Sequence, residues 1–266
     1  MSVPETARGE LIDIAAATRP VPVGRLAASG GAVLVVAPHP DDETLGCGAA
    51  LVRALAAGLD VWIALLTAGG ASHTASRRYP PHRLRRLRLR EFLTASARLR
   101  QGAAALAGPS GRPGRLSTVF LGFDDAAVPH DAARQEAAVA RLLDLAIAAD
   151  ARTLWCSWSG DPHRDHVAAA ALGARVRRRA AGGGRSLALH HYAVWGRFGP
   201  LPARALPPVV TFADPEAGAV KVSAMECYAS QLTALVADDP DGFVMPSDLV
   251  RHFAEHPEIF IAEPGG

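Results

Sequence analysis

The stretch VLVVAPHPDDE, residues 33–43, decides the fold. Its first half is an uninterrupted apolar run, as expected of a strand that is buried on both faces of a sheet. Its second half carries one imidazole and three carboxylates, which cannot lie inside the sheet and must follow the carboxyl end of the strand. In an open α/β sheet, ligands bind at that end. We therefore expect a functional site built around His39, Asp41 and Asp42.

Apolar segments alternate with helical segments along the rest of the chain. We expect strands over 32–37, 61–67, 118–121, 153–158, 187–195 and 209–212. We expect helices over 42–57, 81–100, 132–149, 165–181 and 215–234, with the Gly/Pro-rich residues 101–116 as a surface loop. Strands that alternate with helices indicate βαβ units. The predicted fold class is α/β, a Rossmann-like three-layer sandwich with a mostly parallel central sheet and helices on both faces.

Length and composition favour one large domain. The chain has 266 residues, of which 49% are hydrophobic, and it shows no internal repeat or long linker. We predict a loosely packed lead-in over residues 1–30 and a single domain over residues 31–266. The sequence does not indicate an oligomeric state.

Charge and cysteine content narrow the class of partner and the compartment. The formal net charge of +2 gives no strong general attraction to nucleic acid or to a membrane surface. No stretch approaches the roughly 18 apolar residues of a membrane span, and we find no signal peptide. The three cysteines are far apart and form no CxxC pair, which favours a reducing compartment. We therefore expect a cytoplasmic protein that binds neither nucleic acid nor a membrane.

Two polar clusters, residues 39–42 and 163–166, each follow an apolar strand. Because the carboxyl ends of parallel strands share one edge of a sheet, the two clusters can converge. Two imidazoles and one carboxylate are a usual set of ligands for a catalytic zinc ion that keeps one position for water. We select His39, Asp42 and His166 as the ligands, with Asp41 as a base beside them. Each cluster alone has a structural alternative, since an aspartate at a helix start often serves only as a cap.

These residues resemble the signature of the PIG-L/LmbE-like de-N-acetylases, which is (A/P)HPDDE, a Gly-rich stretch and a later HxDH. The corresponding segments here are PHPDDE at 38–43, GCG at 46–48 and HRDH at 163–166. Weaker matches to the family run from about residue 32 to about residue 260: TAG at 67–69 with SH at 72–73, RLRE at 88–91, LGFDD at 121–125, and Lys221 with YASQ at 228–231. The first motif and HxDH are specific as a pair, whereas the other matches are weak alone.

The resemblance implies zinc-dependent removal of an N-acetyl group from an amino-sugar conjugate. It implies that Asp41 takes a proton from water and returns one to the leaving amine, and that a protonated His163 stabilises the oxyanion. Asp165 then orients His163 or another ligand. Arg88 and Asp125 match the positions that hold sugar hydroxyls. Iron(II) would accept the same ligands as zinc.

Several alternatives remain open at this point. Asp165 is equally well explained as the cap of the helix that follows it, Arg88 as part of a solvated helix face and Asp125 as a turn residue. Two departures from the family pattern, Ala68 in place of Asp or Asn and Asp124 in place of a common Pro, bear on substrate contacts rather than on the metal set.

The arginine-rich residues 77–100 raise a separate question. They lack interleaved aromatic residues, so a solvated helix is favoured over a nucleic-acid surface. A subsidiary hypothesis is that they attract an anionic substrate, such as a phosphorylated or nucleotide-linked sugar.

Two further functions compete with the deacetylase. A non-catalytic carbohydrate-binding protein with the same fold is one, and the intact Asp41 argues against it. A metal-dependent phosphoesterase is the other, but such sites often use two metals and more carboxylates than this sequence assembles.

Overall fold

The computed structural model describes residues 9–109, 111–128, 132–201 and 208–262 of the chain. Within them one seven-stranded sheet has the order β3-β2-β1-β4-β5-β7-β6. Its strands are β1 (Ala32–Ala37), β2 (Val61–Thr67), β3 (Leu116–Phe123), β4 (Ala151–Ser157), β5 (Ala188–Tyr192), β6 (Val209–Phe212) and β7 (Glu258–Ala262). The first five strands of that order are parallel, and β7 runs antiparallel to β5 and β6.

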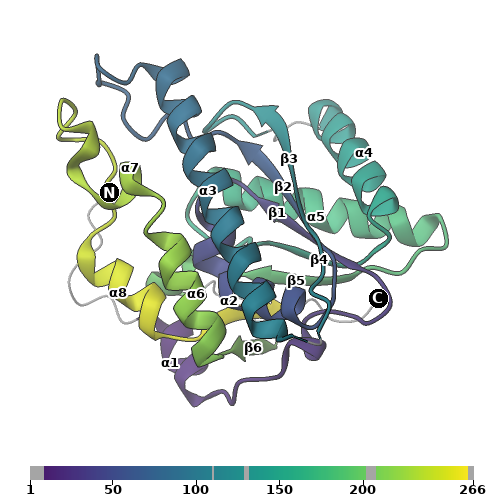
Figure 1. Ribbon diagram of the computed structural model, residues 1–266. Coiled ribbons are helices and arrows are strands. Elements are labelled where there is room, and N and C mark those ends of the chain that lie inside the picture. Colours follow the sequence, from purple (N-terminus) through teal and green to yellow (C-terminus); the bar gives the residue numbers. More distant parts are fainter. Residues whose placement is uncertain (1–8, 110, 129–131, 202–207, 263–266) are drawn as a thin grey trace.

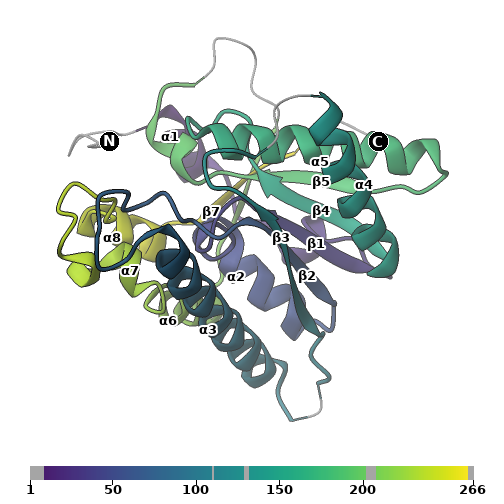
Figure 2. The same ribbon diagram turned by 90° about the horizontal axis from the view of Figure 1, so that it is seen from above.

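Helices cover both faces of the sheet, as Figures 1 and 2 show. The helices are α1 (Glu10–Ala17), α2 (Asp42–Ala56), α3 (Pro81–Ala107), α4 (Ala132–Ala148), α5 (Arg164–Gly182), α6 (Pro215–Met225), α7 (Ala229–Leu232) and α8 (Ser247–Glu255). Helices α2, α3 and α6 lie on one face, and α4 and α5 lie on the other (Figure 2). The predicted three-layer fold is confirmed.

The central strand β1 explains why the sheet is buried on both faces. Val33 and Val35 pack into the core beneath α2, α3 and α6. Leu34 and Val36 pack into the second core, beneath α4 and α5. All four side chains are fully buried, so the apolar run that opens the sequence argument supplies both cores at once.

The strand order reverses beside β1, which pairs with β2 on one side and with β4 on the other. In an open α/β sheet the crevice for ligands lies outside the carboxyl ends of the strands at such a reversal. Loops 38–41 and 158–163 leave the carboxyl ends of β1 and β4. The fold therefore places the two polar clusters next to one another.

The structure corrects four expectations about local elements. Residues 9–30 are not loosely packed, because α1 lies there with Leu11 fully buried. Helix α3 extends through residues 101–107, in place of the expected loop. The helix expected over 215–234 ends at Met225, and the strand expected over 187–195 ends at Tyr192.

Each of these differences has a local physical reason. Residues 103–107 are alanine and leucine, which favour helix, and Gly102 lets α3 approach Val220 of α6 at a distance that a Cβ would prevent. Leu11 supplies α1 with an anchor in a small core near β7. The antiparallel strand β7 lies in a short C-terminal segment that periodicity did not assign.

No helix among the described residues is long and apolar enough to cross a membrane. The division of the chain into a lead-in and one domain stays a prediction.

Candidate metal centre

The imidazoles of the two sequence clusters meet at the carboxyl ends of β1 and β4. The ring centroids of His39 and His166 are 5.4 Å apart, and those of His39 and His163 are 4.6 Å apart. Asp42 lies between the first two rings, with its Oδ2 3.0 Å from His39 Nδ1 and 3.1 Å from His166 Nε2. Donor atoms about 3 Å apart suit one ion with bonds of roughly 2.0–2.2 Å. The residues selected from the sequence therefore fit a single cation.

Each candidate imidazole ligand has a carboxylate near its other ring nitrogen. Asp165 Oδ2 lies 3.2 Å from His39 Nε2, and Asp161 Oδ2 lies 3.3 Å from His166 Nδ1. Carboxylates in such positions fix the tautomer and the orientation of metal-binding histidines. Within the part of the chain that the structure describes, neither ring nitrogen of His166 makes an aligned hydrogen bond. This buried and poorly satisfied imidazole is what a metal ligand would look like.

Two other sets of three side chains also bring their donor atoms within 4.8 Å of one another: His39, His163 and His166, and His39, Asp125 and Asp165. Their atoms have other partners, however. The Nδ1 of His163 accepts the backbone N–H of Asp165. The oxygens of Asp165 accept the backbone N–H groups of residues 126 and 128, and Asp125 accepts that of residue 71. The set with Asp42 therefore fits a cation best.

The electrostatics of the cluster favour a cation. Burial opposes ionisation of Asp42, but His166 and His39 hold the pKa of that carboxyl well below its usual range. Burial also opposes protonation of His166, yet Asp42 and Asp161 raise its pKa to about 10. The pKa of His39 is raised as well, against burial, by hydrogen bonds to Asp125, Asp165 and Asp42. Carboxylates thus outnumber the cations around these rings.

Asp41, the candidate base, lies at the mouth of the cluster beside a buried arginine. Arg88 is 4% exposed and donates to Gly69 O, to Pro40 O and, over 3.1 Å, to Asp41 Oδ2. Burial raises the pKa of Asp41 to about 8, and Arg88 opposes that rise. A general base works best with a pKa near the working pH. Arg88 is not on a solvated helix face, and its clearest contact is with the base.

The backbone of Asp41 is strained. Its φ is +117°, in a region that side-chain-bearing residues rarely adopt. It occupies the cap position of α2, yet its side chain makes no capping hydrogen bond. Strain of this kind persists at sites where the surrounding structure enforces it. The capping alternative for the first cluster is therefore not what the structure shows.

This strain gives a stability prediction. Asp41→Gly and Asp41→Ala both remove the carboxylate, but only glycine relaxes at positive φ. We expect the glycine variant to be more stable than the alanine variant by about 1 kcal/mol, because relief of strain outweighs the greater flexibility of glycine in the unfolded chain. Urea unfolding of both metal-free proteins measures this. Equal stability would show that the backbone at this residue is relaxed.

His163 is held in one orientation by the start of α5. It is the N-cap residue of that helix, and its Nδ1 accepts the Asp165 N–H over 3.2 Å. A ring nitrogen that accepts a hydrogen bond carries no proton, so the N–H lies on Nε2. Burial and the neighbouring His39 and His166 lower the pKa of His163. A neutral His163 can therefore donate from Nε2, whereas the sequence predicted a protonated ring.

The remaining predicted residues also have definite places. Asp165 is not the cap of α5, since it lies in the first turn and contacts His39 rather than the ring of His163. Asp125 lies 3.1 Å from His39 Nε2 and accepts the Ala71 N–H, so it is more than a turn residue. Glu43 lies in the first turn of α2, as predicted, and accepts hydrogen bonds from Tyr228 and Thr44.

The sequence analysis missed Asp161. This side chain is 3% exposed, accepts the backbone N–H groups of Trp195 and Gly196, and faces His166. Its position two residues before His163, in a polar loop after a buried strand, was the signal that could have identified it.

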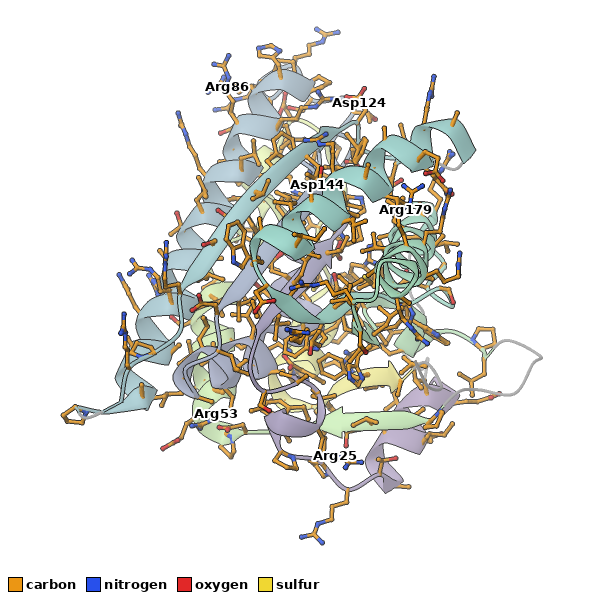
Figure 3. All side chains as sticks on the ribbon, turned by 90° about the vertical axis from the view of Figure 1, so that its right-hand side faces the viewer. Arg25, Arg53, Arg86, Asp124, Asp144 and Arg179 are labelled. Atoms are coloured by element: carbon orange, nitrogen blue, oxygen red, sulfur yellow. The ribbon has the colours of Figure 1, made fainter. Side chains whose placement is uncertain are left out.

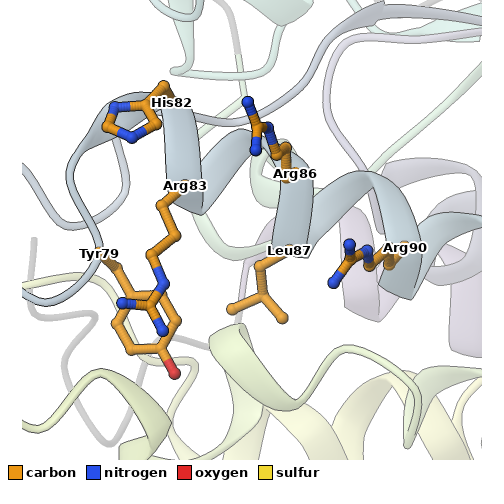
Figure 4. Close-up of a pocket in the computed structure, with 6 residues that line it drawn as sticks. All are labelled: Tyr79, His82, Arg83, Arg86, Leu87 and Arg90. Atoms are coloured by element: carbon orange, nitrogen blue, oxygen red, sulfur yellow. The ribbon is translucent and has the colours of Figure 1, made fainter.

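The arginine-rich helix divides into an inner and an outer face. Arg88 faces inward, and Arg85 pairs with Asp124 near the rim. Figure 3 shows Arg86 and Asp124 at the same end of the molecule. A groove of about 420 Å³ lies on the outer face, lined by Tyr79, His82, Arg83, Arg86, Leu87 and Arg90 (Figure 4). Among the described residues, no carboxylate lines this groove.

Comparison with known proteins places these residues in a family context. A family model described as GlcNAc-PI de-N-acetylase, PIG-L, matches residues 34–176, more than half of the chain. No match was found among curated proteins.

Solved structures share the fold over most of the chain. N,N'-diacetylchitobiose deacetylase from Pyrococcus horikoshii, in complex with an inhibitor, is similar with a TM-score of 0.63 and 15% identity, over 91% of this chain and 87% of that one. Protein TT1542 from Thermus thermophilus gives 0.55 and 25%, over 88% and 95%. The 4-carboxy-2-hydroxymuconate hydratase GalB from Pseudomonas putida KT2440 gives 0.58 and 16%, over 84% and 82%. At such identities the likeness to the deacetylase and to the hydratase shows the fold alone.

Proposed function

Because the chain belongs to the GlcNAc-PI de-N-acetylase (PIG-L) family, we propose that it is a metal-dependent hydrolase that removes an N-acetyl or other N-acyl group from an amino-sugar conjugate. An N-acetylglucosamine derivative is the expected substrate. The observation that carries the proposal is the buried set of His39, Asp42 and His166 with Asp41 beside it. The P. horikoshii relative, a deacetylase of an N-acetylated sugar, supports the substrate class.

His39, Asp42 and His166 would hold the cation, with zinc the expected metal and iron(II) able to use the same ligands. Such an ion polarises a bound carbonyl group and lowers the pKa of water to about 7. Asp165 and Asp161 hold the two imidazoles in orientation through their second ring nitrogens.

The chain's own residues supply the proton transfers. Asp41 Oδ2 is positioned by Arg88 and takes the proton from the attacking water as the new C–O bond forms. The same carboxyl then passes a proton to the amine nitrogen as the C–N bond breaks, so acetate and a free amine leave. His163 donates from Nε2 to the carbonyl oxygen as negative charge develops there. Asp125 and Arg88 are the proposed contacts to sugar hydroxyls.

A non-catalytic carbohydrate-binding protein is the alternative. The strained and buried Asp41 favours the enzyme, because a sugar-binding site does not require a base with its pKa raised to about 8. We also infer a cytoplasmic location, which the three free cysteines support.

The test is acetate and free-amine release from a panel of N-acetylated amino sugars. The protein is stripped with a chelator and then reloaded with zinc or iron(II). We expect equimolar acetate and amine from at least one sugar in the reloaded protein only. Binding of a sugar without release of acetate would favour the alternative.

The outer groove of α3 permits a test of the anionic-substrate hypothesis. Neutralising Arg86 and Arg90 with glutamine removes two of its cations and none of the inner contacts. If an anionic group of the substrate binds there, KM should rise several-fold for a phosphorylated sugar and stay unchanged for its neutral analogue. Arg179→Gln on α5 (Figure 3) is the matched control for loss of surface charge. Unchanged KM values for both sugars would discard the hypothesis.

A further inference from the structure

Helix α2, which carries Asp42 in its first turn, is interrupted one turn later. At Cys47 the backbone has φ −147° and ψ 20°, which is not helical, so residues 42–46 form a short turn separate from residues 48–56. An interruption leaves carbonyl groups of the first piece and N–H groups of the second without helical partners. In a buried helix these groups require other partners.

A lysine and a glutamate from distant segments supply those partners. Glu258, at the start of β7, accepts the N–H of Ala49 over 2.7 Å and that of Ala50 over 2.9 Å. Lys221, on α6, donates to Leu45 O over 2.9 Å and to Glu258 over 3.0 Å. One ion pair thus closes both ends of the break, and Figure 2 shows β7 beside α2 there.

The pair is buried and closely packed. Lys221 is 3% exposed and Glu258 is 2% exposed, and Lys221 is the single lysine of the sequence. A Cβ on Gly48 would lie 3.3 Å from Lys221 Cγ, and one on Gly46 would lie 2.3 Å from the ring of Tyr192. The short turn that carries Asp42 is therefore held from both sides.

Stability alone does not account for this arrangement. Removing two charges from water costs free energy that a buried ion pair often fails to recover, and apolar replacements are frequently neutral or stabilising. A continuous helix would satisfy the same backbone groups without any charge. The break instead allows the turn at residues 42–46 to take an orientation independent of the rest of α2.

We propose that Lys221 and Glu258 are positioning residues, which lock the turn at residues 42–46 and so set the affinity of the cluster formed by His39, Asp42 and His166 for its cation. This inference rests on the proposed function, since it concerns the same metal site. Neither side chain is a ligand or touches the reacting atoms. Both act through the backbone of the segment that presents Asp42.

The test is zinc affinity, measured by competition with a chromophoric chelator on the full-length chain after its own metal has been removed. We expect Lys221→Met and Glu258→Gln each to weaken zinc binding about tenfold, the lower end of the range for groups that orient metal ligands. The double variant should lose much less than the product of the two single losses, because the residues act as one unit.

Arg53→Met is the matched control. Arg53 also joins α2 to α6, through Asp214 and Glu216, but it lies at the other end of the molecule from Asp124 (Figure 3). It should lower the thermal midpoint and leave zinc affinity within about twofold of wild type, since surface ion pairs contribute little beyond their own contacts. If Lys221→Met does not fold, Glu258→Gln, which preserves shape, decides the question.

The outcomes separate the two claims. Wild-type zinc affinity in the folded Lys221 and Glu258 variants would overturn the positioning role and leave the proposed function standing. A wild-type protein that binds no zinc or iron(II) would overturn the proposed function and this inference with it.

Discussion

Asp41→Asn is expected to lower kcat/KM for deacetylation by roughly 10²–10⁴-fold, the usual contribution of a general acid or base. That loss corresponds to about 3–5 kcal/mol of transition-state stabilisation. The reason is that an amide cannot take the proton from water, nor pass one to the leaving amine. Zinc content should remain that of the wild type, because Asp41 is not among the proposed ligands.

Asp144→Asn provides the control for the loss of one aspartate charge. Asp144 lies on α4, in the layer opposite α2 and α3 (Figure 3), and its replacement should leave kinetics unchanged. Steady-state acetate release and metal analysis of both variants give the comparison. An Asp41→Asn enzyme with near wild-type turnover would remove Asp41 from the mechanism.

Removal of His166 should abolish tight metal binding. Its Nε2 faces Asp42 from a fully buried position, so His166→Ala takes away a ligand that no other described side chain replaces at that point. The loss of zinc affinity should exceed the roughly 10- to 100-fold typical of removing an outer partner of a ligand. Activity should fall with it at any attainable zinc concentration.

Asp161→Asn supplies the graded comparison within the same pair. It keeps the shape of the side chain but weakens its hold on His166 Nδ1, so we expect a loss of zinc affinity of about 10- to 100-fold. His256→Ala, at the C-cap of α8, controls for the loss of an imidazole elsewhere. If His166→Ala binds zinc as tightly as His256→Ala does, the ligand assignment is wrong.

The sequence was sufficient for the central features of the fold and site because their signals are local. The apolar run at residues 33–37 can be satisfied only by a sheet covered on both faces, and the polar residues that follow it can lie only at its end. The HxDH segment after a second apolar strand places a second cluster at the same edge by topology alone.

The parts that were missed depend on tertiary contacts. Nothing in the residues around Arg88 distinguishes the inner face of α3 from its outer face, since arginines occur on both. Asp161 became important only because β5 and the segment after it bring Trp195 and Gly196 against its carboxylate. The break in α2 is not visible as a proline, and the residues that stabilise it lie more than 170 positions away along the chain.

Local propensity also misled where packing overrode it. The Gly/Pro-rich appearance of residues 101–116 predicted a loop, yet its first part continues α3 because that helix packs on α6 at Gly102. The reverse holds for residues 226–234, whose composition suits a helix but whose chain turns to bring Tyr228 to Glu43.

The most direct measurement of the central claim is a crystal structure of the zinc-loaded protein, with data collected on both sides of the zinc absorption edge. The account predicts one anomalous peak at roughly 2.0–2.2 Å from an imidazole nitrogen of His39, a carboxylate oxygen of Asp42 and Nε2 of His166. Fully occupied zinc bound anywhere else, with these three side chains left as a hydrogen-bonded cluster, would contradict it.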